Sequence, residues 1–91
     1  MEVDLGRVVL SKAGRDLGRL FVIIEIIDEL YVLIADGDLR RIEKPKKKKI
    51  KHLGFTNKLS SELNNKLMNK DRVTNAEIRR YISSVNIEEI V

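Results

Sequence analysis

The chain has 91 residues, of which 43% are hydrophobic and 35% are charged, a balance typical of one small folded domain and not of a disordered or collagen-like chain. It contains no cysteine and one histidine, which excludes disulfide scaffolds, thiol catalysis and zinc-finger sites and fits a reducing, cytoplasmic location. The net charge of +4 is unevenly spread, because residues 40–52 hold eight basic residues against one acidic residue while residues 1–39 carry a net charge of −4.

Five short β-strands are predicted in the first half of the chain. Apolar and β-branched residues alternate over residues 7–11, 20–27, 30–35, 39–43 and 49–53. Asp28-Glu29 indicates a two-residue connection, and Asp36-Gly37 predicts a type I′ turn, because both central residues of that turn need positive φ. In residues 20–27 the lone charge, Glu25, predicts that the even-numbered face is the buried one.

Five short antiparallel strands can bury their faces only by curling into a small barrel, since an open sheet leaves one face uncovered. We therefore expect a mainly β fold, with a five-stranded SH3-like barrel over residues 1–54. A helical extension of about two helices, residues 55–91, would pack on the barrel. The predicted barrel core consists of Val8, Leu10, Val22, Ile24, Ile26, Val32, Ile34, Ile42, Ile50 and Leu53.

The hydrophobic period becomes helical after Gly54. The spacing of Leu59, Leu63 and Leu67 predicts a first helix with Thr56 or Asn57 as its N-cap. A second helix is indicated by the capping box of Thr74 and Glu77, with Val73 packed against Ile78. Its apolar face would hold Ile78, Tyr81, Ile82 and Val85, and the residues pointing away from that face would be Arg79 and Arg80.

A glycine-punctuated turn separates the first two predicted strands. Gly6-x-Val8 is followed by Gly14-x-Asp16-x-Gly18 and then by an apolar strand, and the segment closes with the pair Arg40-Arg41 and residues 50–53. This pattern resembles the KOW-domain RNA-binding proteins, in particular the KOW-containing large-subunit ribosomal proteins of archaea and eukaryotes and their short bacterial relatives. The resemblance covers a little over half of the chain. It implies RNA binding in or near translation, structural roles for Gly6, Gly14 and Gly18, and RNA contacts from the turn at Lys12, Arg15, Asp16 and Arg19.

The basic run after residue 39 extends this predicted interface, because lysine and arginine bind phosphates largely without regard to base sequence. The residues concerned are Arg40, Arg41, Lys44, Lys46, Lys47, Lys48, Lys49 and Lys51. The alternative is that the run is an exposed loop that only keeps a small domain soluble. In an up-and-down meander the turn around Gly14 and the loop of residues 44–48 would lie at opposite ends of the barrel.

The aromatic residues favour structured RNA over single strands. Phe21 and Tyr31 fall in strands expected to be partly buried and Tyr81 falls on a helix, so no interleaved stacking platform for single-stranded bases is predicted. His52 has no carboxylate or second histidine at ligand spacing, so no catalytic residue, metal or cofactor is expected and the protein is not predicted to be an enzyme. A membrane partner is not expected either. The alternative function is a protein-interaction module that uses the barrel or the C-terminal helices.

Overall fold

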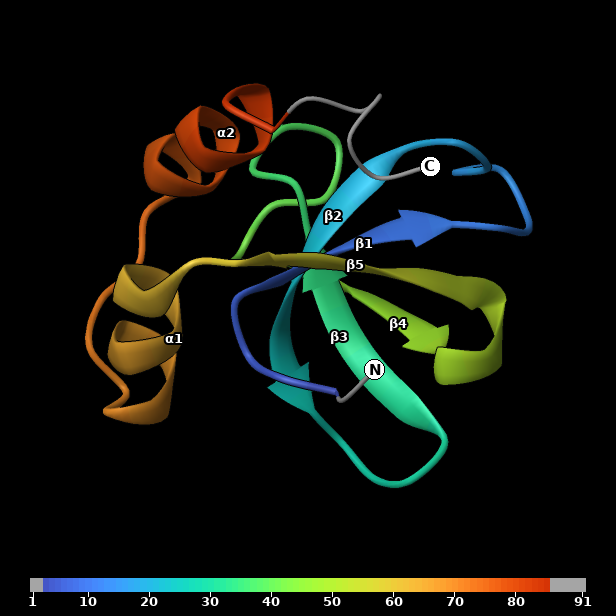
Figure 1. Ribbon diagram of the computed structural model, residues 1–91, viewed down its shortest axis with the longest axis horizontal. Helices are drawn as coiled ribbons and strands as arrows, with labels where there is room; N and C mark the ends of the chain where they lie inside the picture. The colour runs from blue at the N-terminus through green and yellow to red at the C-terminus, as the bar shows by residue number, and fades with distance from the viewer. Residues whose placement is uncertain (1–2, 86–91) are drawn as a thin grey trace.

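A five-stranded antiparallel sheet lies at the centre of the computed structural model, which describes residues 3–85 (Figure 1). The strands are β1 (Arg7–Ser11), β2 (Leu20–Ile26), β3 (Tyr31–Ala35), β4 (Lys46–Lys49) and β5 (Leu53–Leu59), in the spatial order β4-β3-β2-β1-β5. A short 3₁₀ helix, η1 (Ile50–His52), joins β4 to β5, and two helices follow, α1 (Ser61–Met68) and α2 (Asn75–Ser83). The predicted fold class, mainly β with two C-terminal helices, is confirmed. Within residues 3–85, neither helix has the length and apolar character needed to span a membrane.

The sheet is buried on both faces, because successive side chains enter two separate apolar clusters. The inner cluster, inside the curled sheet, consists of Val9, Phe21, Ile23, Val32, Ile34 and Leu53. The outer cluster, between the sheet and the helical segment, consists of Val8, Val22, Ala35, Leu63, Val73 and Ile78. Figure 1 shows the resulting layers, with α1 and α2 on one side of the strands and β4 and η1 on the other.

The expectation that only one face of β2 is buried is wrong. Phe21, Val22 and Ile23 are all fully buried, whereas Ile26 is 44% exposed. A strand covered on both faces has a continuous apolar sequence, which hides the alternation that would mark a half-exposed strand. Of the other predicted core residues, five are buried and four are half-buried; the half-buried ones are Leu10, Ile24, Ile42 and Ile50.

The fourth strand lies later in the chain than the sequence pattern predicts. Residues 39–43 belong to a loop of residues 36–45, and the lysine run forms β4, paired with β3 from Ile34↔Lys46 to Tyr31↔Lys49. Residues 50–53 form η1 and the start of β5 instead of a strand of their own. In the loop, the backbone N–H of Ile42 donates to Oδ1 of Asn75 at 2.8 Å. This bond to a distant helix replaces the strand pairing that the local alternation suggested.

The two predicted two-residue turns are also wrong, because an aspartate side chain organises a longer connection in each case. Residues 27–30 join β2 to β3, and Oδ1 of Asp28 accepts the N–H groups of Leu30 and Tyr31 at 2.8 and 2.9 Å. Oδ1 of Asp36 accepts the N–H groups of Asp38 and Arg40 at 2.9 and 2.8 Å. Such side-chain acceptors stabilise wide loops as well as tight turns.

Helix α1 begins at a different residue from the predicted one. β5 continues to Leu59, and Ser60 caps α1 by accepting the N–H of Leu63 at 3.1 Å. Thr56, one of the predicted caps, is buried in β5 and donates its hydroxyl to the carbonyl of Val8 at 2.6 Å. Leu63 alone of the predicted leucine stripe is buried, while Leu59 is 39% exposed in the strand.

The capping box that predicted α2 is confirmed. Oγ1 of Thr74 accepts the N–H of Glu77 at 3.2 Å, and Oε2 of Glu77 accepts the N–H of Thr74 at 3.1 Å. Val73 and Ile78, on either side of the cap, are both buried in the outer cluster. Local hydrogen bonds and an apolar contact therefore define the start of this helix.

Helix α2 packs against loop 36–45 through its first turns. The side-chain amide of Asn75 donates to the carboxylate of Glu43 at 2.9 and 3.0 Å, a bond that holds the pKa of Glu43 below its ordinary value. Nη1 of Arg79 donates to the carbonyl of Gly37. Arg79 and Arg80 are both exposed, as the sequence predicts, and Arg79 also reaches this loop.

Gly37 sets the distance between this loop and α2. Its φ is +78°, and a Cβ added there would lie 2.4 Å from the backbone oxygen of Asn75. Positive φ and this close approach both require a residue without a side chain. Gly18 provides a comparison, because its φ is +84° and nothing lies within 4 Å of an added Cβ.

Gly37→Ala is expected to destabilise the protein more than Gly18→Ala. Both substitutions strain a left-handed backbone, at a cost of about 1 kcal/mol, but only the first also forces α2 away from the loop, for a total of about 2–4 kcal/mol. Urea unfolding of both variants measures the difference. Equal losses would show that α2 does not depend on the close approach at Gly37.

Glu77 is expected to link the stability of α2 to pH. Its hydrogen bond from Nζ of Lys66, at 2.7 Å, lowers the pKa of its carboxyl, and the N–H of Thr74 lowers it further. The ionised form therefore stabilises the folded state above the unfolded-state pKa of about 4.3, and this contribution is lost as the pH falls through the lower folded value. Glu77→Gln should be less stable than the native protein at pH 7, and the gap should close near pH 3.

Thermal unfolding at both pH values measures this effect. Glu62→Gln is the matched control, because the side chain of Glu62 is 79% exposed and lies 3.6 Å from the same lysine. If the stability difference between the native protein and Glu77→Gln is the same at both pH values, the ionised carboxyl of Glu77 does not stabilise the folded state.

Candidate nucleic-acid interface

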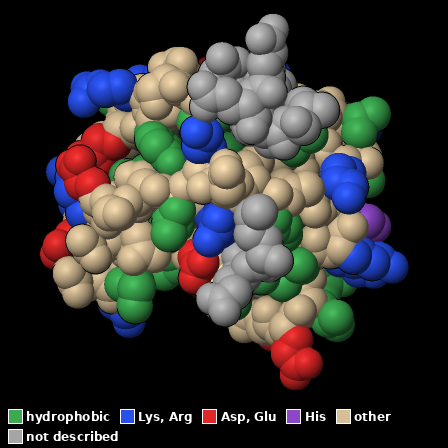
Figure 2. All heavy atoms as spheres, viewed as in Figure 1, with side chains coloured by type: hydrophobic (Ala, Val, Ile, Leu, Met, Phe, Trp, Pro, Cys, Tyr) green, Lys and Arg blue, Asp and Glu red, His purple; other side chains and the backbone are tan. Residues whose placement is uncertain are grey.

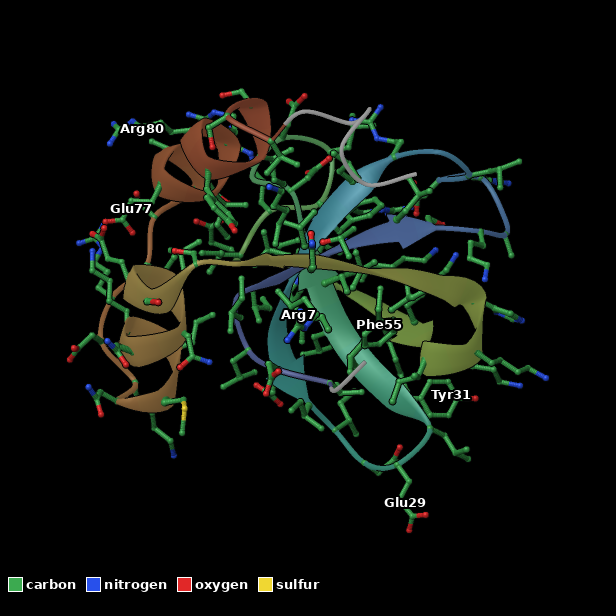
Figure 3. All side chains as sticks on the ribbon, in the orientation of Figure 1. Arg7, Glu29, Tyr31, Phe55, Glu77 and Arg80 are labelled. Atoms are coloured by element: carbon green, nitrogen blue, oxygen red, sulfur yellow. The ribbon has the colours of Figure 1, made fainter. Side chains whose placement is uncertain are left out.

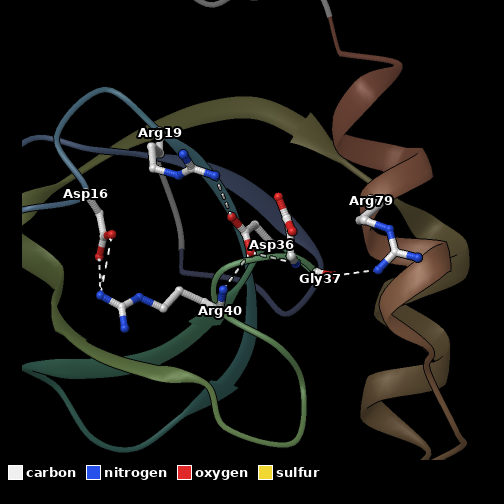
Figure 4. Close-up of polar contacts among 7 residues, drawn as sticks. Asp16, Arg19, Asp36, Gly37, Arg40 and Arg79 are labelled. Carbon is white, nitrogen blue, oxygen red and sulfur yellow. Dashed lines mark hydrogen bonds and ion pairs between the residues drawn. The ribbon is translucent and has the colours of Figure 1, made fainter.

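Two buried aspartates and two arginines join the β1–β2 loop to the β3–β4 loop (Figure 4). Asp16 of the first loop accepts from Nη2 of Arg40 in the second at 3.2 Å. In the reverse direction, Arg19 at the end of the first loop donates to Asp36 at the start of the second, also at 3.2 Å. Asp16 and Asp36 are only 5% and 6% exposed, so each carboxylate needs its arginine to offset the loss of hydration.

The carboxylate of Asp16 joins the two loops instead of closing its own turn. Its carboxylate binds Arg40, and the turn is closed by backbone hydrogen bonds, from the N–H of Leu17 to Gly14 at 3.2 Å and from the N–H of Arg19 to the carbonyl of Asp16 at 3.0 Å. Gly14 and Gly18 have φ of +80° and +84°, as their place in the motif predicts. The carboxylate of Asp16 therefore positions the two loops relative to each other.

Gly6, the first glycine of the motif, lies against the helical segment and away from this turn. A Cβ added to it would lie 2.9 Å from the backbone nitrogen of Asn64, and its carbonyl accepts the N–H of Ser60 at 3.3 Å. This glycine therefore lets the chain before β1 approach the start of α1.

The turn around Gly14 and the lysine run were expected at opposite ends of the barrel, but in the structure they are in contact. Nζ of Lys48 donates to the carbonyl of Ala13 at 2.8 Å, and the N–H of Lys12 donates to the carbonyl of His52 at 2.8 Å. We call this junction of β4, η1 and the β1–β2 loop the seam. The expectation of opposite ends is wrong because the sheet curls. The short helix η1 joins the end of β4 to the start of β5, and this start pairs with the end of β1, beside the turn.

The lysine run is a strand in which alternate residues differ in exposure, and not a uniformly exposed loop. Lys48 is 8% exposed, whereas Lys47 and Lys49 are exposed and their ammonium groups lie 4.4 and 6.0 Å from the centroid of the Tyr31 ring. β4 is also an edge of the sheet, where lysine discourages pairing with another chain. Lys46, at its start, is half-buried.

Five exposed basic residues surround the seam, and we call them the cationic surface. They come from the β1–β2 loop, β4 and η1, and they are Lys12, Arg15, Lys47, Lys49 and Lys51. In Figure 2, Lys and Arg side chains gather with the histidine at the edge of the molecule that carries these segments. Arg41 and Lys44 are exposed in the loop of residues 36–45. No group of three or more His, Cys, Asp or Glu side chains in residues 3–85 could hold a metal ion.

Sequence reasoning missed the role of Asp36 and the placement of Lys47 and Lys49 over the ring of Tyr31, which is half-buried as expected. Asp36 precedes a glycine, so it indicated a turn, and nothing nearby indicated that its carboxylate would be buried against Arg19. Tyr31 belongs to neither the inner nor the outer cluster among the described residues, and Figure 3 shows it at the periphery of the sheet. Its place directly after a turn was the available signal.

The chain is similar to ribosomal and ribosome-binding proteins. It is 39% identical over 69 residues to the Bacillus subtilis protein named "Putative ribosome-binding protein YbzG", an alignment that covers 71% of this chain and 93% of the relative. The chain belongs to the KOW-domain family. Large ribosomal subunit protein eL14 of Pyrobaculum arsenaticum is 38% identical over 56 residues, 62% of this chain and 54% of the relative.

The plant relative matches a shorter part of the chain. Large ribosomal subunit protein eL14 of Pisum sativum is 44% identical over 39 residues, which cover 43% of this chain and 29% of the relative. The chain spans about half the length of the archaeal eL14 proteins it matches. No protein-family model matches this chain.

Lys48 and Lys47 are expected to differ in their effect on stability although they are neighbours of the same type. Lys48→Ala leaves the carbonyl of Ala13 without its ammonium donor and opens the seam, which should cost about 1–3 kcal/mol. Lys47→Ala removes an exposed side chain and should change stability by less than about 0.5 kcal/mol. Urea unfolding of the two variants measures this, and equal stabilities would contradict the seam contact.

Proposed function

We propose that this protein associates with the ribosome by binding structured RNA through its cationic surface, in a role without a catalytic step. The relatives that carry ribosomal names support the ribosomal setting. The observation that carries the proposal is the gathering of five exposed cations from three chain segments around one seam. This role is consistent with a cytoplasmic location.

The proposed contact residues fall into two groups with different tasks. The first group contacts phosphates directly and consists of Lys12, Arg15, Lys47, Lys49 and Lys51, with Arg41, Lys44 and Lys46 at its margin. The second group positions the first, because its charged groups already have protein partners: it consists of Asp16, Arg19, Arg40 and Lys48. The side chains of Arg19 and Arg40 are 43% and 32% exposed, so their charges can also add to the local potential.

The cationic surface can attract phosphates because the carboxylates near it are already paired with arginines. Asp16 follows Arg15 in the turn and Asp36 pairs with Arg19 at its end, and the charges of the two aspartates are offset by Arg40 and Arg19. The exposed cations therefore act on a phosphate backbone without strong opposition from these two acids. Arg15 is held on a turn closed by backbone hydrogen bonds, so little conformational entropy is lost when its planar guanidinium binds a phosphate.

This surface favours recognition of folded RNA by its shape and its phosphate backbone. Lysine and arginine side chains on a rigid barrel bind phosphates at fixed positions, which suits a helical backbone of defined geometry. Affinity from such contacts comes largely from release of counterions and falls steeply with salt.

A second candidate function is binding of a protein partner. An open hollow lies between β2 and the end of α1, and its apolar lining consists of Leu5, Ile24, Ile26, Leu67 and Met68. Met68 is 65% exposed and Ile26 is 44% exposed, so an apolar segment of a partner could cover them. In Figure 1, α1 and the end of β2 lie on the opposite side of the molecule from β4 and η1.

The salt dependence of RNA affinity is expected to increase with the number of phosphate contacts. With four to five contacts, the logarithm of the association constant should fall against the logarithm of salt concentration with a slope of about −4, at about 0.9 per contact. Arg15→Ala and Lys47→Ala should each weaken binding of every structured RNA and flatten the slope by about one unit, with the larger loss of affinity for Arg15→Ala. Fluorescence anisotropy at three salt concentrations measures these slopes.

Arg80→Ala is the matched control for these variants. It removes the same charge from an exposed position on α2, and Figure 3 shows Arg80 on the helical side, far from Tyr31. Its slope should equal that of the native protein. A native slope near zero, or an equal effect of Arg80→Ala and Arg15→Ala, would favour the protein-interaction alternative. Sedimentation with purified ribosomes at low and high salt tests the ribosomal setting separately.

A further inference from the structure

Tyr31 borders a hollow at the surface whose lining is both apolar and cationic. The lining residues are Glu29, Leu30, Tyr31, Lys49, Ile50 and Lys51. Leu30 is 65% exposed, so this part of the hollow is open to solvent. Figure 3 shows Tyr31 beside the β2–β3 turn that carries Glu29, at the end of the sheet opposite to the helices.

Tyr31 is half-buried, and its ring packs against neither apolar cluster. It belongs to neither buried cluster described above, and its nearest charged neighbours are the ammonium groups of Lys47 and Lys49, at 4.4 and 6.0 Å from the ring centroid. A half-buried aromatic ring with two lysines over it, next to an open hollow, has the components of a site for one nucleobase: a face for stacking and cations for the adjoining phosphates.

We propose that this hollow receives an unpaired nucleobase of the bound RNA, stacked on Tyr31, while Lys49 and Lys51 contact the phosphates on either side of it. The inference rests on the proposed RNA-binding function and adds a preference for RNA with an unpaired nucleotide beside a helical segment. Lys47 and Lys49 belong to both the cationic surface and the surroundings of Tyr31, so the stacked base and the helical backbone would be bound side by side.

The lysines over the ring can be displaced by a base. A cation–π contact at an exposed site is weaker than the stacking of a base on an aromatic ring. The lysine side chains are flexible, so their ammonium groups can turn from the ring to a phosphate without movement of the backbone. Glu29, on the other side of the hollow, disfavours a phosphate there, which directs the phosphates toward Lys49 and Lys51.

A pair of RNA duplexes tests the proposal. One duplex is fully paired, and the other is identical except for a single bulged 2-aminopurine nucleotide. The native protein should bind the bulged duplex about tenfold more tightly and change the fluorescence of the 2-aminopurine. Tyr31→Leu should bind both duplexes with the affinity that the native protein shows for the paired one, whereas Tyr31→Phe, which keeps the ring, should retain the preference.

Tyrosine emission gives a second readout from the protein itself. The chain has two tyrosines and no tryptophan, so in Tyr81→Phe the emission comes from Tyr31 alone. Stacking of a base on the ring should quench this emission with the bulged duplex and leave it nearly unchanged with the paired duplex. Urea unfolding of each variant accompanies the titrations, and equal stability of Tyr31→Leu and Tyr31→Phe shows that lost preference is not lost folding.

The outcomes separate the two proposals. If the native protein binds neither duplex, RNA binding itself is wrong. If it binds both equally, with no quenching of Tyr31, RNA binding stands and the base site is wrong. If Tyr31→Leu weakens binding of both duplexes by the same factor, Tyr31 contacts the backbone and not an unpaired base, which also overturns the inference.

Discussion

Two buried carboxylates, one in each of two neighbouring loops, control much of this structure. A carboxylate deprived of water needs a partner of opposite charge, and both Asp16 and Asp36 find an arginine on the other loop. The reciprocal pairs fix the loops relative to each other, and each loop then supports a different part of the molecule. The first carries the exposed cations of the motif turn, and the second carries Gly37, against which α2 packs.

Both faces of the sheet are buried, and each face is covered by a different part of the chain. The outer cluster is completed by residues from the helical segment, so the helices are part of the core and not a separate appendage. The opposite side, formed by β4, η1 and the first loop, is left to the lysines and to Tyr31. Because the helices already cover the apolar outer face, the exposed cations on the other side are not needed to cover it.

The sequence predicts features whose determinants lie close together in the chain and misses those that depend on distant partners. The bounds of β1 and the capping box of α2 were predicted correctly, since alternation and the Thr74–Glu77 pair are local. The lysine strand was not predicted, because four consecutive lysines have no apolar pattern and become a strand only by pairing with β3. The partner of Ile42 is 33 residues away on α2, which no local pattern could indicate. The motif glycines and the basic residues were found from the sequence, whereas the pairing of Asp16 with Arg40 required the fold.

The lysine strand couples folding to the ionic surroundings. β4 has a single neighbouring strand, and its like charges at Lys47 and Lys49 project to the same face, where they repel each other. Any polyanion that binds this face relieves that repulsion in the folded chain, while the unfolded chain offers no such ordered row. By mass action the folded state then gains free energy in proportion to the logarithm of the polyanion concentration, once that concentration exceeds the dissociation constant. A polyanion bound to this face would therefore help to hold the strand in place.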